Sequence, residues 1–399
     1  MYVAPPLAWY GHAHAQQLLT CRALTALADV PESLPLIAAD ELRTWATMSM
    51  AQVCARVMHR FVDLPLDELD QLTATAFRTF NGGCEPPLPL VRVGDKTFLE
   101  TGNGPTLAFK DVGQQVVARL LNIYLGKSGR HANIIVETSG DTGPAAIAGV
   151  AGCEHADIFC LYPCGRVTDV QELQMITASA SNVHVFRTEG DTDEQAEALK
   201  LLFSDGAFMA RHDVCSINSI NWARVMTQSA YYFWACLQVR PNMDGSVHFV
   251  VPTGAFGNAV GGLIAKLMGA PVGRIVCATN ANDVVHRTIS HGDLSIAPNV
   301  PTISPAMDIQ FACAPPPRPD SLRRSHSAAQ PRGAAPSLSL SLLVPCVRRQ
   351  RRAPPLFHQW RRYRCDRSLH ERRSGSPSRA SSGNTPPSCA PDLHLRCGQ

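Results

Sequence analysis

The sequence predicts an α/β protein with parallel sheets, a small helical domain on its N-terminal side and a C-terminal tail that stays unfolded. One observation is the repeated alternation of short apolar strands with amphipathic helices over residues 90–310, which is typical of parallel βαβ units. The other is a change of composition. Residues 311–399 hold 16 Arg, no Lys and 4 Asp or Glu (16 − 4 = +12), and residues 1–310 hold 20 Lys or Arg and 29 Asp or Glu (20 − 29 = −9). Compositions this different rarely belong to one folding unit.

The first 89 residues predict two regions. Residues 1–38 have no acidic residue before Asp29; this weakly resembles a transit peptide, but a poorly defined start is the favoured interpretation. Residues 39–89 predict a helical domain, with a first helix from Asp40 and a second that Ser49 caps. A third helix begins near Leu66, and we expect the Asn-Gly-Gly run at 81–83 to form its C-cap.

The alternating pattern over residues 90–310 predicts a series of strands and helices for the α/β part. We expect strands at 98–100, 133–138, 157–162, 183–186, 247–251 and 274–278. We expect helices at 111–125, 144–150, 169–177, 193–203, 220–236 and 258–268. Ligands of such sheets bind at the carboxyl ends of the strands, so the loops that follow the strands are the places to search for a site.

Composition excludes several classes of protein. No run of 18 apolar residues occurs, so we expect no membrane span and no membrane partner. The 14 cysteines show neither CxxC pairs nor the spacing of Cys/His ligands, which argues against a metal site or a regular disulfide framework. Scattered thiols favour a reduced, cytoplasmic setting, with an organelle as the open alternative.

A single lysine is the first candidate for chemistry. Lys110 follows the apolar run Leu107-Ala-Phe109 and precedes Asp111. An ammonium group avoids apolar surroundings because it is strongly hydrated. A lysine held there can lose its proton and attack a carbonyl carbon, forming a Schiff base. The alternative is an ordinary lysine on a helix surface.

Two loops between strand and helix are candidates for binding anions. Ser139, Gly140, Asp141 and Thr142 follow an apolar strand, and their hydroxyl and N–H groups could form an anion cradle. The alternative is a plain turn capped by Asp141 or Thr142. The second loop runs Gly254-Ala255-Phe256-Gly257-Asn258. It has neither a Walker sequence nor GxGxxG spacing, so a small phosphate monoester fits it better than a nucleotide.

A third stretch precedes the helix expected at 220–236. It contains Asn218, Ser219, Asn221 and Arg224, whose amide, hydroxyl and guanidinium groups could hold a second anion through charge-assisted hydrogen bonds. The alternative is a capped helix with an exposed arginine. Together, a reactive lysine, an anion cradle and a phosphate loop describe a site for pyridoxal 5′-phosphate and an amino-acid substrate.

The order of these motifs resembles the threonine synthase family, in particular its fungal and enterobacterial branch and the animal threonine synthase-like proteins. The resemblance covers about residues 39–310. It rests on the segments 104–111, 138–143, 171–175, 218–224, 252–258 and 307–310, read together and in this order.

The resemblance implies the pyridoxal-phosphate fold type II, similar to the tryptophan synthase β subunit, and residues for each role. Lys110 carries the cofactor, and the loop Gly254 to Asn258 holds its phosphate. Ala255 stands where the family has Asn; the difference is tolerated if backbone amides bind the phosphate, and otherwise it removes a side-chain contact. The loop Ser139 to Thr142 holds substrate and cofactor.

The implied reaction converts O-phosphohomoserine and water to threonine and phosphate, which makes the protein a carbon–oxygen lyase acting on phosphates. The freed Lys110 amine moves protons at Cα and Cβ, and Asn218, Ser219, Asn221 and Arg224 grip the substrate phosphate. Two alternatives stay open. A phospholyase that yields a 2-oxo acid would use the same residues, and a truncated chain could be catalytically dead. The expected partner is a small phosphorylated amino acid, with no nucleic acid.

The sequence departs from the family at both ends. The family's Ser-Thr-Arg-Gly start is not recognisable in residues 1–38, and after Gln310 its long α/β continuation gives way to Pro-, Ser- and Arg-rich sequence. Such a stretch has little apolar surface to bury, so we predict disorder over residues 311–399. Arginine without lysine favours a non-native stretch, read in a wrong frame or through an intron, over a real basic tail that could bind nucleic acid.

Overall fold

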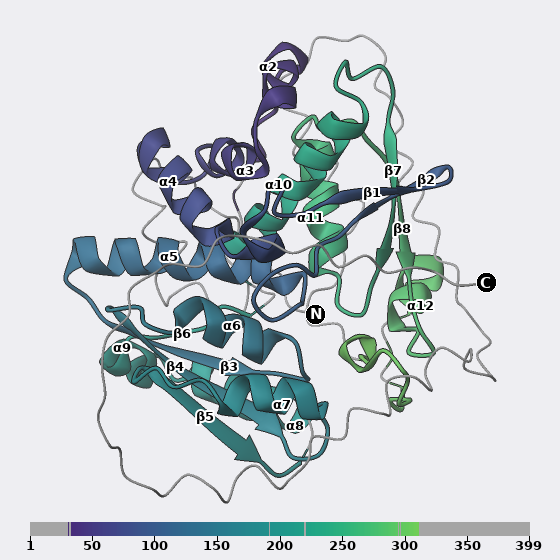
Figure 1. Ribbon diagram of the computed structural model, residues 1–399. Helices are drawn as coiled ribbons and strands as arrows, with labels where there is room; N and C mark the ends of the chain where they lie inside the picture. The colour runs from purple at the N-terminus through teal and green to yellow at the C-terminus, as the bar shows by residue number, and fades with distance from the viewer. Residues whose placement is uncertain are drawn as a thin grey trace, which may run out of the picture. The chain divides into compact units, whose positions relative to one another are not determined.

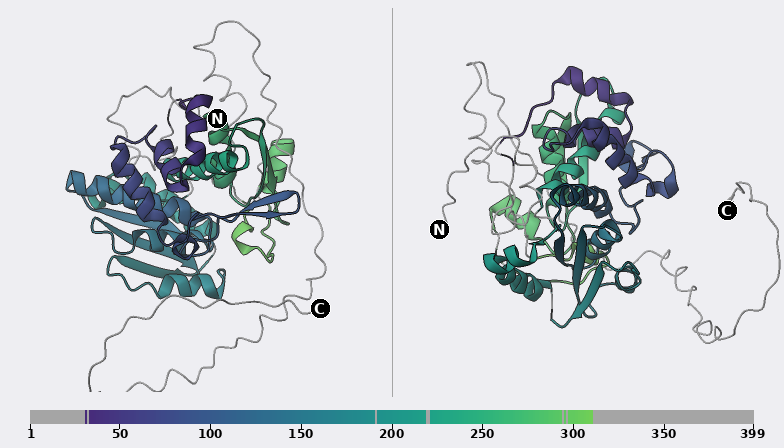
Figure 2. Two further views of the ribbon diagram at one scale, coloured as in Figure 1. Left: turned by 45° about the horizontal axis from the view of Figure 1, so that its top comes forward. Right: turned by 90° about the vertical axis from the view of Figure 1, so that its left-hand side faces the viewer.

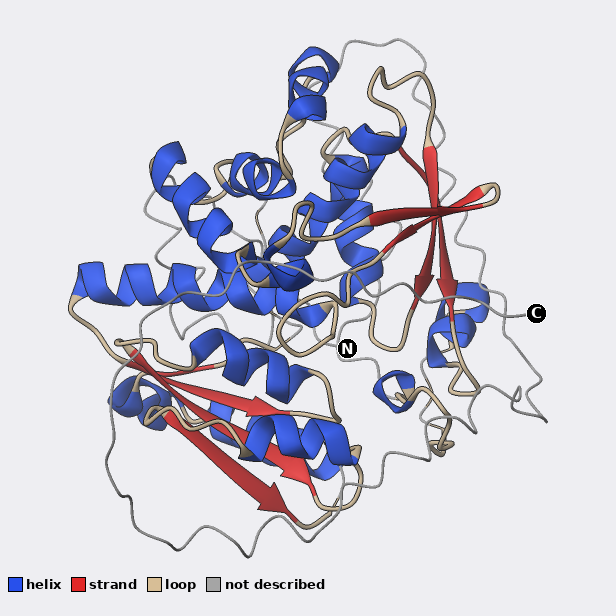
Figure 3. Ribbon diagram, viewed as in Figure 1, coloured by secondary structure: helices blue, strands red, loops and turns tan. Residues whose placement is uncertain are grey.

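The computed structural model describes residues 31–310 except 32, 191, 219, 220, 294 and 296. The expectations for residues 1–30 and 311–399 lie outside this part of the chain. Figures 1 and 3 show the strands gathered into a four-stranded sheet, a separate parallel pair and a hairpin. The first two consist of parallel strands, as the βαβ pattern predicts.

The N-terminal helices form much as expected. They are α2 (Ala39–Thr44), η3 (Trp45–Thr47), α3 (Met50–Met58) and α4 (Leu66–Phe77). Ser49 caps α3 in a full capping box with Gln52, since each side chain bonds the other's backbone N–H. The predicted Asn-Gly-Gly C-cap is wrong. Helix α4 ends at Arg78, and Asn81 lies in a separate turn, η4 (Phe80–Gly83), with its own left-handed backbone.

An antiparallel hairpin follows, of which the sequence predicted one strand only. Strand β1 (Leu90–Val93) pairs with β2 (Lys96–Leu99) across a two-residue turn. The hairpin carries exposed apolar side chains, among them Val93 and Phe98. Buried and exposed residues do not alternate along β1, so the sequence carries no strand periodicity from which β1 could be predicted.

The first α/β unit has the strand order β5-β4-β3-β6. Its strands are β3 (Ala132–Glu137), β4 (Ala156–Pro163), β5 (Val183–Thr188) and β6 (Val214–Cys215). Its helices are α5 (Lys110–Ser128), α6 (Thr142–Val150), α7 (Asp169–Ile176), α8 (Thr192–Ser204) and α9 (Gly206–His212). Alternate residues of β3 and β4 are buried, which fixes their register. The short elements α9 and β6 were not predicted.

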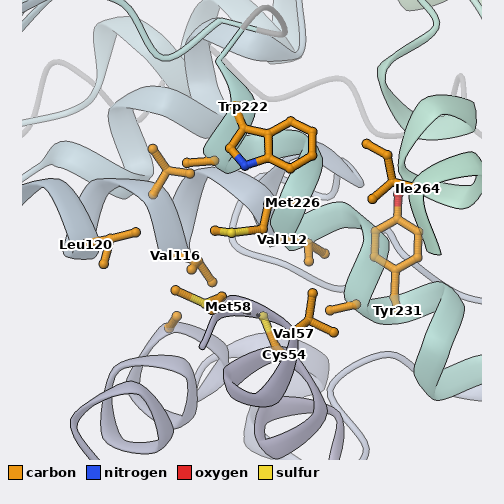
Figure 4. Close-up of a cluster of buried hydrophobic side chains, with 14 of the residues drawn as sticks. Cys54, Val57, Met58, Val112, Val116, Leu120, Trp222, Met226, Tyr231 and Ile264 are labelled. Carbon is orange, nitrogen blue, oxygen red and sulfur yellow. Dashed lines mark hydrogen bonds between the residues drawn. The ribbon is translucent and has the colours of Figure 1, made fainter. Parts of the chain in front are cut away.

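Helix α10 (Trp222–Val239) organises the interior. It packs against α3, α5 and α11 (Gly257–Leu267), and 15 of its 18 residues are buried, so it meets protein on every side. The views in Figure 2, turned from that of Figure 1, show α5 between the N-terminal helices and the four-stranded sheet. Figure 4 shows the shared core of these helices, in which Val57, Val116 and Met226 meet.

The second α/β unit consists of β7 (Val247–Pro252), α11 and β8 (Val272–Ala278), followed by α12 (Val284–His291) and η5 (Pro305–Met307). Strands β7 and β8 pair in parallel, and one face of the pair packs on the core through Val251, Ile275 and Cys277. On the other face Val250 is 71% exposed. Other elements usually cover both faces of a parallel sheet, so the exposed face of the β7–β8 pair is unusual.

The described residues bear on two exclusions drawn from composition. No helix among them is long and apolar enough to cross a membrane. In this same part of the chain, the cysteines are free thiols, and no group of three or more Cys, His, Asp or Glu side chains could hold a metal ion.

Candidate functional site

Lys110 is the first residue of α5, immediately after an irregular loop. Asp111 organises that loop, since its carboxylate accepts hydrogen bonds from the Thr106 backbone N–H (2.8 Å) and hydroxyl (2.6 Å). A Cβ atom on Gly104 would lie 2.5 Å from the Asp111 side chain, so the turn requires glycine at that position. The sequence suggested that the apolar run Leu107–Phe109 surrounds the lysine. Leu107 is 74% exposed, however, so the whole run does not bury the lysine.

The Lys110 amine is held in surroundings that favour its neutral form. Its side chain is only 16% exposed, and burial lowers the pKa of the amine below the usual value for lysine. The positive charge of Arg224 lowers this pKa further, whereas the Asp141 carboxylate, 3.7 Å from Nζ, raises it. A lysine with a lowered pKa can act as a nucleophile and as a base near neutral pH.

The loop from Ser139 to Thr142 lies beside this amine. The Thr138 hydroxyl accepts hydrogen bonds from the backbone N–H groups of Gly140 (3.0 Å) and Gly143 (2.9 Å), which holds the loop in a tight turn. Helix α6 has Asp141 at its N-cap position but receives no side-chain cap. The alternative of a turn capped by Asp141 therefore fails, and the Asp141 carboxylate faces Lys110 instead.

Arg224 is a buried cation without a carboxylate partner among the described residues. It is 2% exposed, and burial lowers its pKa to about 10. Its Nη1 donates to the Ile217 carbonyl (3.2 Å), and its Nε has no partner. The alternative of an exposed arginine is wrong. A buried guanidinium without a counter-charge is costly unless an anion binds beside it.

The other residues of the third stretch divide into different roles. Asn218 donates from Nδ2 to Glu137 Oε2 (2.6 Å), while its Oδ1 is buried and unpaired. Asn221 caps α10, since its Oδ1 accepts from the Ala223 N–H (3.0 Å) and its Nδ2 donates to the Ser216 carbonyl (3.2 Å). Ser219 lies outside the described residues.

Two glutamines that the sequence did not single out border the same place. Gln114 Nε2 donates to the Ile217 carbonyl (3.0 Å), the acceptor that Arg224 also uses, and its Oε1 is unpaired. Gln228, one turn after Arg224 on α10, also has a buried unpaired Oε1. Buried polar atoms usually find partners, so this concentration of unpaired ones indicates a place for a polar ligand or water. No sequence pattern distinguishes these glutamines.

The second Gly-rich loop leads into α11. This helix begins at Gly257 without a side-chain cap, so its first N–H groups can bind an anion. The Asn258 side chain has another task, because its Oδ1 accepts from the hydroxyls of Tyr231 (2.6 Å) and Tyr232 (2.7 Å). A Cβ atom on Gly254 would lie 2.7 Å from the Met307 Cα. The loop can therefore lie this close to the 305–307 turn only with glycine at position 254.

Helix α10 connects the lysine with this loop. Its Arg224 acts on the Lys110 amine, and its Tyr231, about two helical turns further on, bonds Asn258 at the start of α11. The structure therefore connects Lys110, Asp141, Arg224 and the Gly254–Asn258 loop through one framework of helices. Lys110 and Arg224 thus interact although they lie more than a hundred residues apart in the sequence.

Comparisons with known proteins agree with this arrangement. The family model described as pyridoxal-phosphate dependent enzyme matches residues 94–330, and the one described as threonine synthase N terminus matches residues 27–77. Threonine synthase-like 2 of Homo sapiens is 42% identical over 289 residues, which are 70% of this chain and 59% of that protein. Threonine synthase of Pseudomonas aeruginosa is 40% identical over 286 residues, 71% of this chain and 60% of that protein.

Solved structures give the same result. The structure of PLP-bound threonine synthase from Brucella melitensis superposes with a TM-score of 0.68 at 36% identity, covering 75% of this chain and 64% of that one. For threonine synthase from Escherichia coli the TM-score is 0.70 at 29% identity, and the match covers 84% of this chain and 74% of that one.

The chain belongs to the family of pyridoxal-phosphate dependent enzymes, with the fold type II that the sequence resemblance implied. Within that family its relatives are the threonine synthases and the threonine synthase-like proteins, which confirms the resemblance. The chain spans about three fifths of the length of the curated relatives it matches.

Pyridoxal phosphate is accordingly the cofactor, and the residues present fit it. A buried lysine with a lowered pKa suits its aldehyde. An uncapped helix N-terminus after a Gly-rich loop suits its phosphate. The roles assigned to Lys110 and to the loops remain predictions that the mutants described below would test.

Proposed function

We propose that this chain is the cofactor-binding part of a threonine synthase-like lyase, which converts O-phosphohomoserine and water to threonine and phosphate. The observation that carries the proposal is Arg224. It is a buried guanidinium without a carboxylate partner among the described residues, close enough to Lys110 to lower the pKa of its amine. A phosphorylated amino acid supplies the anion that this arrangement lacks.

Lys110 has the properties that the proton transfers need. When bound, pyridoxal phosphate withdraws electrons from the substrate and so acidifies the protons on its Cα and Cβ. Because burial lowers the pKa of the Lys110 amine, the amine can more readily take a proton from one carbon and return it to another. Asp141 lies on the side of the amine where it can stabilise the ammonium form between these transfers.

The leaving phosphate gains its charge stabilisation from the start of α10. Arg224 and Asn218 each carry an unpaired polar atom, the donor Nε and the acceptor Oδ1. In the proposal Arg224 neutralises the phosphate as the Cγ–O bond breaks, and Asn218 orients the substrate. Ser219 is proposed to bind the same phosphate from the sequence alone, since it follows Asn218 in the chain. Asn221 holds the helix start in place through its cap and positions the N–H groups nearby.

The test measures products from O-phosphohomoserine with the purified chain and pyridoxal phosphate. We expect phosphate and threonine in equal amounts, no activity in Lys110→Ala, and a loss of about 100-fold in Arg224→Gln, the scale on which one group that stabilises a transition state acts. Phosphate with a 2-oxo acid in place of threonine would identify the phospholyase. Binding of cofactor without any product would favour the catalytically dead chain.

A matched variant separates charge from folding. Arg224→Lys keeps a buried cation, and we expect it to retain more phosphate release than Arg224→Gln, although it loses the planar fork. If both variants bind pyridoxal phosphate and turn over as the wild type does, Arg224 has no part in the reaction and the proposed phosphate site is wrong.

A further inference from the structure

Helix α7 contacts both loops that surround Lys110, and one of its side chains holds the carboxylate that faces the amine. Gln171 Nε2 donates to Asp141 Oδ1 (2.7 Å), while Asp141 Oδ2 lies 3.7 Å from Lys110 Nζ. We propose that Gln171 is a positioning residue, which fixes the Asp141 carboxylate against the Lys110 amine and thereby sets the pH at which that amine becomes reactive. The inference rests on Lys110 as the reactive lysine of the proposed function.

The direction of the Gln171 amide is fixed by the start of its own helix. Thr168 caps α7, and its backbone N–H donates to Gln171 Oε1 (3.0 Å), completing a capping box. Because Oε1 is used in this way, the NH2 group must face the other direction, toward Asp141. The cap of α7 therefore selects a donor, and not an acceptor, for the carboxylate.

The backbone around Asp141 leaves room for this contact and for nothing larger. A Cβ atom on Gly140 would lie 2.6–2.8 Å from the amide group of Gln171, and Gly140 has a φ of +148°. Both facts require glycine next to the carboxylate. Gln171 thus fills the space directly over the residue that precedes Asp141.

The same helix holds the loop that precedes the lysine. Gln174, one turn after Gln171, donates from Nε2 to the Thr106 carbonyl (3.2 Å). Met175 is fully buried, and its sulfur lies 2.7 Å from where a Cβ atom on Gly143 would be. Through these contacts α7 sets the distance between the loop that precedes Lys110 and the loop that contains Asp141. The effect of the Asp141 charge on the Lys110 amine depends on this distance.

If Gln171 acts on Lys110 through Asp141, Gln171→Glu and Thr168→Ala should differ in their effect on the pKa of the Lys110 amine. A purely structural role of Gln171 would not produce this difference. Gln171→Glu keeps the oxygen that the capping box needs, since Glu is common at this position, but it places a carboxylate oxygen against Asp141 Oδ1. The added negative charge near Lys110 raises the pKa of its amine. Thr168→Ala weakens the cap of α7 but leaves the Gln171 amide in place, because the Thr168 backbone N–H that bonds it is kept, so the pKa of the Lys110 amine should not change.

The experiment uses the chain without cofactor, so that it does not depend on turnover. Reductive methylation with formaldehyde is followed by mass spectrometry from pH 6 to 11, with the exposed Lys96 as internal reference. We expect the pH midpoint for labelling of Lys110 to rise by about one unit in Gln171→Glu and to stay unchanged in Thr168→Ala. Asp141→Asn should move the midpoint below that of the wild type.

Denaturant midpoints measured in parallel show which variants are folded. The inference predicts a lower denaturant midpoint for both variants, because Thr168→Ala loses the cap and Gln171→Glu loses the hydrogen bond to Asp141 and brings two carboxylates together. An unchanged labelling midpoint in folded Gln171→Glu would overturn it. Turnover of O-phosphohomoserine is assayed separately, so a chain that shows the labelling shift without turnover refutes the proposed reaction and supports the role of Gln171.

Discussion

At the scale of single residues, Lys110 illustrates how burying a charged group reduces stability. Its side chain is buried and its pKa is lowered, so the folded chain holds the proton of this amine less tightly than the unfolded chain does. A group of this kind opposes folding below its unfolded pKa of about 10.4, and the penalty vanishes as the pH rises to that value.

We therefore expect Lys110→Met to increase the unfolding free energy of the cofactor-free chain by about 1 kcal/mol at pH 7, the scale of gain found when functional residues are replaced. The difference between mutant and wild type should shrink as the pH rises toward about 10.4, because the unfolded lysine then loses its proton as well. Urea titrations at pH 7, 9 and 10 measure it. A mutant that is less stable than the wild type at pH 7 would contradict the proposed cost of burying this amine.

Asn258 is a second residue whose role depends on its partners. Its Oδ1 accepts from two buried tyrosine hydroxyls, and burial raises the pKa of both tyrosines. Asn258→Ala removes this acceptor from the Tyr231 hydroxyl, whereas the Tyr232 hydroxyl keeps the Asn258 backbone carbonyl (3.1 Å), and we expect a loss of about 1–2 kcal/mol in unfolding free energy.

Asn258→Asp is the matched control, since it retains an acceptor oxygen for both tyrosines. We expect it to unfold at a denaturant concentration closer to that of the wild type, and to bind pyridoxal phosphate more weakly because it places a negative charge at the helix N-terminus. Equal stability of the Ala and Asp variants would show that these hydrogen bonds do not hold α11 in place.

At the scale of elements, close contact between helices depends on glycine. A Cβ atom on Gly149 of α6 would lie 2.8 Å from the Gln114 backbone oxygen on α5, and backbone atoms cannot move aside as a flexible side chain can. The start of α5 carries Lys110 and that of α6 follows Asp141, so the separation of these helices also sets the geometry of the site.

We expect Gly149→Ala to lower the unfolding free energy by about 1–3 kcal/mol, the usual cost of overpacking. Gly206 at the start of α9 provides the control, because a Cβ atom there meets nothing within 4 Å, and Gly206→Ala should be neutral or slightly stabilising. Chemical denaturation of the two variants side by side tests this. A Gly149→Ala chain as stable as the Gly206→Ala chain would mean that α5 and α6 have room to separate.

At the scale of the whole molecule, cofactor binding and folding are linked. The proposed cofactor site draws on α5, α6, α10 and α11, so an unfolded chain could not form it. A ligand that binds only the folded state stabilises it by about 2.7 kcal/mol at a concentration one hundred times its dissociation constant.

We expect pyridoxal phosphate to raise the thermal midpoint of the wild type, by about 5 °C or more at saturating concentration for a chain of this size. The shift should be much smaller in Lys110→Ala, which retains the phosphate loop but loses the amine. Differential scanning fluorimetry over a range of cofactor concentrations measures both. An equal shift in the two proteins would mean that Lys110 does not carry the cofactor.

The sequence by itself determined the local features of this protein. Short apolar runs identified β3 and β4, in which alternate residues are buried, and Ser49 marked the start of α3. The order of motifs around Lys110 was sufficient to identify the family, because each motif keeps its spacing within one loop or helix start. Short elements such as β6, α9 and α12 escaped, since a few residues carry too little periodicity.

Only the tertiary structure decided which residues meet. The burial of Arg224, the orientation of Asp141 by Gln171 and the unpaired oxygens of Gln114 and Gln228 all depend on contacts between segments distant in sequence. Chemical type does not reveal whether an arginine is exposed or a glutamine lies beside a lysine. Burial and charge separation determine a pKa, and both are properties of packing, so the motif could single out Lys110 but only its neighbours explain why its pKa is lowered.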